Sequence, residues 1–148
     1  MCTSITFKNG DFYFGRNMDL EYSFGECVTV TPRRFPFRFR YEGALASHYA
    51  MIGMAAGEAS FPLYAEAVNE KGLCMAGLNF PGNASYGKAA EGKANAAVYE
   101  LIPWLLGTCV SGRPKKSWAR STLQTMHFPK PCRLRRCTGC WRTGRDAL

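Results

Sequence analysis

The sequence has no long apolar run: none of its runs approaches the roughly 18 residues that a membrane-spanning helix requires. Its first residues, Met-Cys-Thr-Ser-Ile, also lack the basic and apolar segments of a secretory signal peptide. Charged residues make up only 20% of the chain and apolar residues 47%, which excludes wholesale disorder. We therefore expect a soluble cytoplasmic protein, and 148 residues predict about one domain.

Acidic residues are almost absent from the last quarter of the chain. Residues 1–112 hold nine Lys and Arg against ten Asp and Glu, whereas residues 113–148 hold ten Lys and Arg against Asp146 alone. The formal charge of +8 therefore arises in the tail and says little about the partners of the body. Three of the seven cysteines also crowd into the tail, and without an export signal we interpret the others as reduced thiols.

The body is predicted to consist mostly of antiparallel strands. Ser4–Phe7 and Phe12–Phe14 are β-branched and aromatic and flank an Asn-Gly turn, which predicts a hairpin. Residues 63–68 face residues 73–78 across a second turn. Pro103 fits best in the first turn of a helix, where its missing N–H costs nothing.

Cys2 is the first candidate for chemistry. Removal of Met1 would place a thiol and a free α-amine on one residue, and their ordinary pKa values are close enough for proton transfer between them. This is the logic of an N-terminal nucleophile, in which the amine accepts the thiol proton and the thiolate attacks a carbonyl. A penultimate cysteine by itself is more often without a catalytic role.

Three further residues could assist such a thiol. Arg16 follows the predicted hairpin and could lower the pKa of a thiol, and Asp19 could hold an amine or the guanidinium in place. Asn79 follows a predicted strand and could direct its amide N–H at an oxyanion. Taken alone, these residues are better explained by a surface Arg–Asp pair and by an Asn that organises a turn.

Five segments in order resemble the choloylglycine hydrolase family, which comprises bile salt hydrolases and penicillin V acylases. They are Met-Cys-Thr at the start, Phe-Gly-Arg-Asn-Met-Asp at 14–19, Asn-Glu-Lys-Gly-Leu at 69–73, Ala-Gly-Leu-Asn-Phe-Pro at 76–81 and Glu-Leu-Ile-Pro-Trp-Leu-Leu-Gly at 100–107. The resemblance covers residues 1 to about 111. We therefore expect residues 1–112 to be the N-terminal part of a domain of this family.

The resemblance implies an α+β fold, the αββα sandwich of N-terminal nucleophile hydrolases, of which this chain holds the N-terminal part only. It further implies a homotetramer, no metal and no organic cofactor. Carried over by position, Cys2 is the nucleophile, Arg16 the cation beside it, Asp19 the carboxylate that orients the amine and Asn79 an oxyanion donor. The expected reaction is hydrolysis of a linear amide through an acyl-cysteine.

The implied substrate is a conjugated bile salt, which would be cleaved to release glycine or taurine. Asn79 resembles the bile salt hydrolases more than the penicillin V acylases, which tend to carry Tyr there; a penicillin V acylase-like or other linear amide hydrolase is the alternative. A steroid requires a wide apolar cleft. Candidates to line it are Leu20, Tyr22, Phe24 and Phe61, for each of which ordinary packing is an equally good explanation.

The tail also supports a hypothesis from another functional class, a binding protein rather than an enzyme. Cys132, Cys137 and Cys140, with His127 upstream and several arginines around them, could form a basic zinc-dependent module that binds nucleic acid. Their spacing matches no standard finger or knuckle. With a hydrolase as the main reading, we expect neither a nucleic acid nor a membrane among the partners.

A shifted reading frame explains the tail more simply. New codons formed from the last base of one codon and the first two of the next force Ala from Met126–His127, Leu from Cys140–Trp141 and Gly from Trp118–Ala119. With permitted wobble bases, the shifted frame also reads Asn-Ile-Ala-Asp-Asp, which resembles what the family carries after its Ile-Pro-Trp helix. We therefore expect residues 113–148 to be out of frame, after one base lost near Val110 to Pro114, and to form no domain.

The frameshift predicts a truncated and inactive chain. The family's remaining catalytic positions, a second Asn and a second Arg, lie downstream of this point. Roughly half of the sandwich would also be absent, which leaves strands without partners and an apolar face without cover. We expect the 148-residue chain to fold poorly and to lack activity.

Overall fold

The computed structural model describes residues 2–57, 60–78, 85–86, 88–89, 91, 94–108, 126–127 and 142–143. Its strands are β1 (Thr3–Asn9), β2 (Asp11–Asn17), β3 (Cys27–Thr31), β4 (Phe37–Phe39), β5 (Gly43–Leu45), β6 (Met51–Ala56), β7 (Leu63–Asn69), β8 (Leu73–Ala76), β9 (Ser85–Tyr86), β10 (Met126–His127) and β11 (Arg142–Thr143). Its helices are the short 3₁₀ helix η1 (Val98–Glu100) and α1 (Leu101–Thr108).

The strands form one main sheet and three two-stranded pairs. The main sheet has the order β11-β8-β7-β6-β3, and the pairs are β1 with β2, β4 with β5 and β9 with β10. Every strand pair that the structure describes is antiparallel, as the sequence predicts.

The predicted hairpin at the N-terminus is confirmed. β1 and β2 pair along their full length around Gly10, whose φ of 70° is a conformation that favours glycine. β7 and β8 form the second predicted hairpin, across the turn at 69–72. Pro103 is the third residue of α1 and therefore lies in its first turn, where no N–H is needed.

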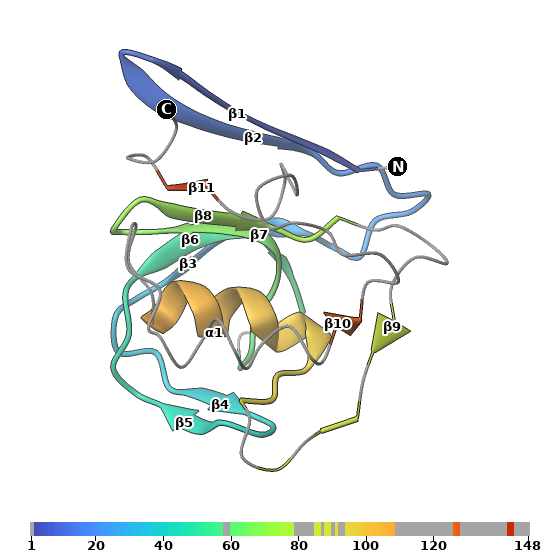
Figure 1. The fold of residues 1–148 in the computed structure, drawn as a ribbon, viewed down its shortest axis with the longest axis vertical. Coiled ribbons are helices and arrows are strands. Elements are labelled where there is room, and N and C mark those ends of the chain that lie inside the picture. Colours follow the sequence, from blue (N-terminus) through green and yellow to red (C-terminus); the bar gives the residue numbers. More distant parts are fainter. Residues whose placement is uncertain are drawn as a thin grey trace.

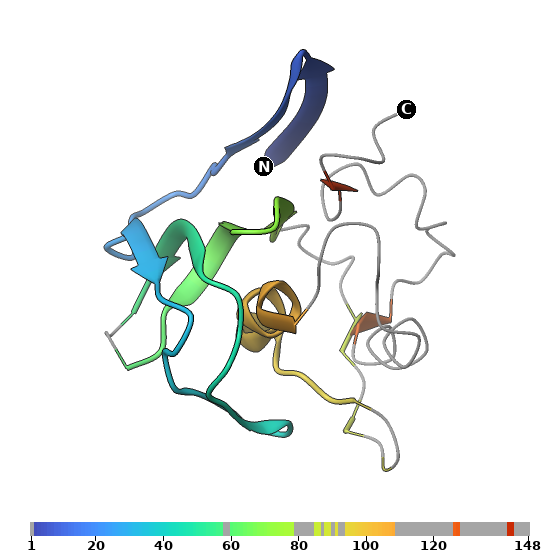
Figure 2. The same cartoon turned by 90° about the vertical axis from the view of Figure 1, so that its left-hand side faces the viewer.

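Three layers follow one another through the molecule. Helix α1 covers one face of the main sheet, and the β1–β2 hairpin lies beyond the opposite face (Figure 1). A quarter turn shows the same order, with the hairpin and α1 on opposite sides of the sheet (Figure 2). Helix α1, the main sheet and the hairpin therefore form the order α, β, β, which corresponds to three of the four layers of the expected αββα sandwich.

The hydrophobic core lies between α1 and the sheet. Leu105 and Leu106 of α1 are fully buried against side chains from β6, β7 and β8. Phe37 of β4 closes the core from the side and is also fully buried. The face of the sheet toward the hairpin is different, since Val28 and Val30 of β3 are largely exposed there.

The start of α1 is fixed by a buried carboxylate. Glu100 is 2% exposed, and its two oxygens accept hydrogen bonds from the backbone N–H groups of Arg40 (2.6 Å) and Ala97 (3.0 Å). At the other end, the buried Asn69 donates from Nδ2 to the Leu106 carbonyl at 2.7 Å. These contacts hold α1 in place over the sheet whose other face carries the candidate site.

Candidate functional site

The first hairpin brings Cys2 and Arg16 together. In the antiparallel register, Thr3 pairs with Asn17 and Ser4 with Arg16, so the residue before β1 lies beside the end of β2. Arg16 directs Nη2 at the Cys2 sulfur, at 3.5 Å. Cys2 is 4% exposed, and its thiol is in the reduced form. A cation held against a thiol favours the thiolate, which is the reactive form.

Arg16 is itself anchored by two other segments. Its Nη1 lies 2.5 Å from Glu66 Oε2 on β7, and its Nη2 donates to the Gly77 carbonyl at 2.7 Å, just beyond β8. The arginine side chain is 5% exposed, and its Nε has no hydrogen-bond partner among the described residues. The guanidinium therefore joins the hairpin layer to the main sheet directly beside the thiol.

Glu66 is a site residue that the sequence reasoning missed. It is separated from Arg16 by 50 residues, so no local spacing could connect the two. One signal was available: Glu66 is the one charged residue of β7, whose sequence is Leu-Tyr-Ala-Glu-Ala-Val-Asn. A carboxylate inside such a strand requires a partner if it is buried.

The other two predicted catalytic residues lie close in the sequence to segments of this cluster. Asp19 lies two residues beyond β2 and is exposed. Asn79 lies outside the described residues, although the chain passes Arg16 at Gly77 just before it. The roles of Cys2, Arg16, Asp19 and Asn79 remain predictions.

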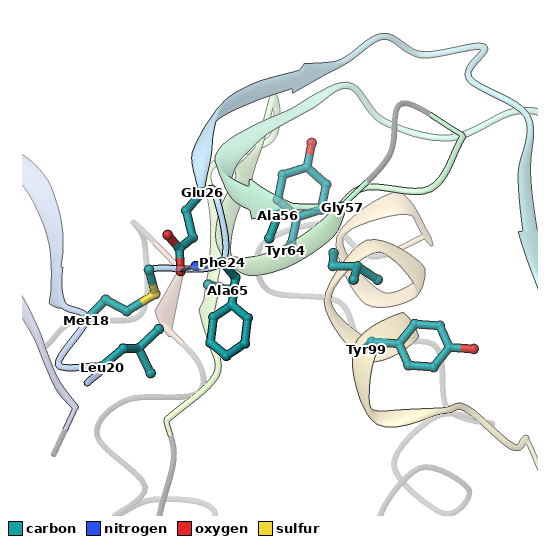
Figure 3. Close-up of a pocket in the computed structure, with 10 residues that line it drawn as sticks. Met18, Leu20, Phe24, Glu26, Ala56, Gly57, Tyr64, Ala65 and Tyr99 are labelled. Carbon is teal, nitrogen blue, oxygen red and sulfur yellow. Dashed lines mark hydrogen bonds between the residues drawn. The ribbon is translucent and has the colours of Figure 1, made fainter. Parts of the chain in front are cut away.

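An open pocket of about 420 Å³ lies next to these elements. It is bounded by the loop after β2, the end of β6, the start of β7 and η1 (Figure 3). Glu26 is the one charged residue among ten lining residues, and the rest are apolar, aromatic or glycine. Met18 lies two residues after Arg16, just beyond β2, and Ala65 lies next to Glu66 on β7, so the pocket and the thiol cluster draw on neighbouring residues of the same two segments.

The lining loop is held by Glu26. Its carboxylate accepts hydrogen bonds from Ser23 Oγ at 2.6 Å and from the Phe24 N–H at 3.0 Å. The same two hydrogen bonds lower the pKa of Glu26, so the carboxylate is charged at neutral pH. This local network sets the position of the Phe24 ring, which points into the pocket (Figure 3).

The four predicted substrate-binding residues divide into two groups. Leu20 and Phe24 line the pocket, and Tyr22 lies against Phe24 with the ring centroids 5.0 Å apart. Phe61 instead belongs to an aromatic cluster at the edge of the core. Its ring meets those of Phe37, Phe39 and Tyr99, of which Tyr99 lines the pocket. Whether any of the four contacts a substrate remains a prediction.

The other cysteines differ from Cys2. Cys74 on β8 is buried, and burial raises the pKa of its thiol to about 11, so this thiol is protonated and inert at neutral pH. Cys27 is exposed at the start of β3. The three tail cysteines lie outside the described residues.

In the part of the chain that the structure describes, no three His, Cys, Asp or Glu side chains are grouped so that they could hold a metal ion.

Among the described residues, no helix is long and apolar enough to cross a membrane.

Comparison with known proteins gives one consistent result. A family model described as linear amide C–N hydrolases, choloylglycine hydrolase family, matches residues 2–125. A bile salt hydrolase/transferase of Lactiplantibacillus plantarum is 50% identical over 129 residues, which are 86% of this chain and 40% of that protein. A bile salt hydrolase/transferase of Clostridium perfringens is 43% identical over 110 residues, 72% of this chain and 33% of that one.

Solved structures agree with these relatives. A mutant of conjugated bile acid hydrolase from Clostridium perfringens superposes with a TM-score of 0.69 at 39% identity, over 76% of this chain and 35% of that one. A second variant of that enzyme gives a TM-score of 0.72 at 34% identity, over 82% and 38%. The predicted α+β fold, the N-terminal portion of the αββα sandwich, is confirmed. The chain spans about 40% or less of the length of these relatives.

Proposed function

Because the chain belongs to the choloylglycine hydrolase family of linear amide C–N hydrolases, we propose that the whole protein hydrolyses the amide bond of conjugated bile salts and releases glycine or taurine. The observation that carries this proposal is the Cys2 thiol, placed at the second residue of the chain and 3.5 Å from the Arg16 guanidinium. The apolar pocket beside it supports a substrate with a large apolar body.

In the proposed mechanism Cys2 is the nucleophile. After Met1 is removed, the α-amine of Cys2 accepts the thiol proton and the sulfur attacks the amide carbonyl, which forms a tetrahedral intermediate. The C–N bond then breaks, and the leaving amine takes the proton and departs as glycine or taurine. Water attacks the remaining thioester, which frees the bile acid and restores the thiol.

Three residues assist this nucleophile in the proposal. Arg16 stabilises the thiolate by its charge, since the guanidinium lies directly against the sulfur. Asp19 orients the α-amine, and Asn79 donates to the oxyanion that forms on the carbonyl oxygen. Leu20, Tyr22, Phe24 and Phe61 contact the steroid. No step requires a metal or an organic cofactor.

The proposal extends to the assembly and location of the full-length protein. We propose a homotetramer in the cytoplasm, with the bile salt as its partner and with neither a nucleic acid nor a membrane among its partners. We also propose that residues 113–148 are read out of frame. Resequencing the DNA from the codon of Trp104 through the stop codon, and about 600 bases beyond, tests the frame.

The test of function uses the 148-residue protein and the product of a gene with one base added between the codons of Val110 and Pro114. Each is incubated with taurocholate, glycocholate and penicillin V, and the released amine is measured. Cys2→Ser is the matched control because it removes the thiol and keeps the shape of the side chain. We expect the frame-restored protein to release taurine or glycine and its Cys2→Ser variant to release neither.

The other outcomes are equally informative. Release by the 148-residue chain would support the function and contradict the expected inactivity of this chain. Cleavage of penicillin V in preference to both bile salts would transfer the proposal to the acylase branch of the family. Absence of amine release from every protein, with every substrate, would overturn it.

A further inference from the structure

The ion pair behind the Cys2 thiol connects two segments that the sequence separates widely. Arg16 extends from β2 in the hairpin layer, and Glu66 extends from β7 in the main sheet. The carboxylate accepts from Nη1, whereas the Cys2 sulfur and the Gly77 carbonyl lie at Nη2. One planar group therefore faces the carboxylate with one nitrogen and the thiol with the other.

The contact with Glu66 determines where the guanidinium can lie. An arginine side chain is long and flexible, but its planar fork is fixed once two of its nitrogens are held. Gly77 alone would hold Nη2 and leave the plane free to rotate about that contact. The Glu66 contact at Nη1 removes this freedom and keeps Nη2 directed at the sulfur.

We propose that Glu66 is a positioning residue that holds the Arg16 guanidinium against the Cys2 thiol. The inference deepens the proposed function and rests on it, because it assigns Glu66 to the activation of the proposed nucleophile. Glu66 acts through Arg16, since the described contacts place the arginine between the carboxylate and the sulfur.

The charge of Glu66 and its anchoring of Arg16 have opposite effects on the pKa of the Cys2 thiol. Variants that remove one without the other can therefore separate the two effects. The negative charge of Glu66 partly cancels the charge of Arg16 and so disfavours the thiolate, whereas the anchoring of Arg16 favours it. Glu66→Gln removes the charge and keeps an oxygen that can accept from Nη1. Glu66→Ala removes both charge and anchor. If Glu66 positions Arg16, Glu66→Ala raises the pKa of the thiol, whereas Glu66→Gln leaves it unchanged or lowers it.

The experiment measures alkylation of Cys2 by iodoacetamide as a function of pH in the 148-residue chain and in the frame-restored protein, with each cysteine followed separately by peptide mass spectrometry. Arg16→Gln is expected to raise the pH midpoint for Cys2 by about one unit, the lower end of the effect of an adjacent opposite charge. Glu66→Ala should raise the midpoint by half of that shift or more. Glu66→Gln should leave it unchanged or lower it.

Two controls keep the result interpretable. Cys74 is buried on β8 and burial raises the pKa of its thiol to about 11, so its resistance to alkylation reports that the sheet is intact. If Glu66→Ala exposes Cys74, Glu66→Asp replaces it, because the shorter side chain keeps the charge and withdraws the anchor. In the Arg16→Gln background, Glu66→Ala should raise the midpoint no further, since no guanidinium is left to position.

Two results would overturn the proposal. One is a Glu66→Ala midpoint equal to that of the unchanged protein while Cys74 stays protected. The other is an equal downward shift in Glu66→Ala and Glu66→Gln, which would make Glu66 only a counter-charge. Alkylation needs no substrate, so this test can succeed where bile salt hydrolysis fails, and it can fail where hydrolysis is observed.

Discussion

Two arginine–glutamate ion pairs have their glutamates four residues apart, one on β7 and the other in the turn that follows it. Glu66 lies in β7 and meets Arg16, whose side chain is 5% exposed. Glu70 follows β7 and meets Arg33, whose side chain is 72% exposed. The first pair, which is partly buried, lies against a thiol, whereas the surface pair lies between two loops. The comparison shows that surroundings, rather than the two residue types, determine what such a pair can do.

The difference follows from the cost of removing charges from water. A surface pair is screened by solvent and salt and contributes little to stability, however good its geometry. A buried pair loses its hydration, so each partner depends on the other, and a third group nearby experiences their field at low screening. Arg16 can therefore act on Cys2, while Arg33 only ties the loop after β3 to the turn after β7.

The largest effect is expected from a glycine that lets β7 approach β6. A Cβ on Gly53 would lie 2.0 Å from the Glu66 carbonyl oxygen and 2.6 Å from the Ala67 Cα. Backbone atoms cannot yield as a flexible side chain can, so Gly53→Ala must push β7 away and move Glu66 with it. We expect a loss of about 3 kcal/mol in the free energy of unfolding, measured by urea denaturation.

Gly15→Ala is the matched control for this change. Gly15 also lies in a strand, β2, but a Cβ there would meet only the Ile5 side chain, at 3.4 Å. We expect a change within about 0.5 kcal/mol, as for substitutions that break no specific feature. Equal losses in the free energy of unfolding for the two variants would show that the close approach of β6 and β7 does not cause the loss in Gly53→Ala.

The second prediction compares the two pairs directly. Glu66→Ala leaves the Arg16 guanidinium buried with one fewer acceptor, and we expect a loss of about 2 kcal/mol. This is less than the ~3 to 5 kcal/mol typical of a fully buried pair, because Gly77 still accepts from Nη2 and Glu66 is partly exposed. Glu70→Ala should cost clearly less, because Arg33 remains hydrated after the change.

Urea denaturation of both variants at low and high salt checks this ordering. The effect of Glu70→Ala should shrink in high salt, whereas that of Glu66→Ala should persist, since buried pairs are screened less. A loss for Glu70→Ala that equals the loss for Glu66→Ala would contradict the distinction drawn from burial.

Much of the local fold could be predicted from the sequence because its signals are local. The Asn-Gly turn and the aromatic and β-branched residues around it predict the first hairpin, and the structure has it in the expected place. Pro103 likewise marks the first turn of α1. What could not be predicted is the order of the main sheet, because strand neighbours such as β3 and β6 depend on contacts between distant segments.

The site divides in the same way. The hairpin register alone brings Cys2 beside Arg16, so this contact was accessible from the sequence. The contact with Glu66 requires the hairpin layer to lie over the main sheet, and this packing has no local signal. Leu20 and Phe24 reach the pocket from the loop directly after β2, whereas Phe61 joins the aromatic cluster of the core edge through tertiary packing.

The smallest effect is expected at acid pH from the surface pair. The hydrogen bonds from Arg33 and, next, from the Ala50 N–H lower the pKa of Glu70 from 4.5 to about 2. A lowered pKa in the folded state contributes stability that is fully present above about pH 4.5 and is lost as the pH falls toward 2. The stability gap between the unchanged protein and Glu70→Gln should therefore narrow between pH 5 and pH 2, as should the gap for Arg33→Gln. A gap of constant size over this range would show that the pair does not respond to the protonation of Glu70, and that its role is only steric.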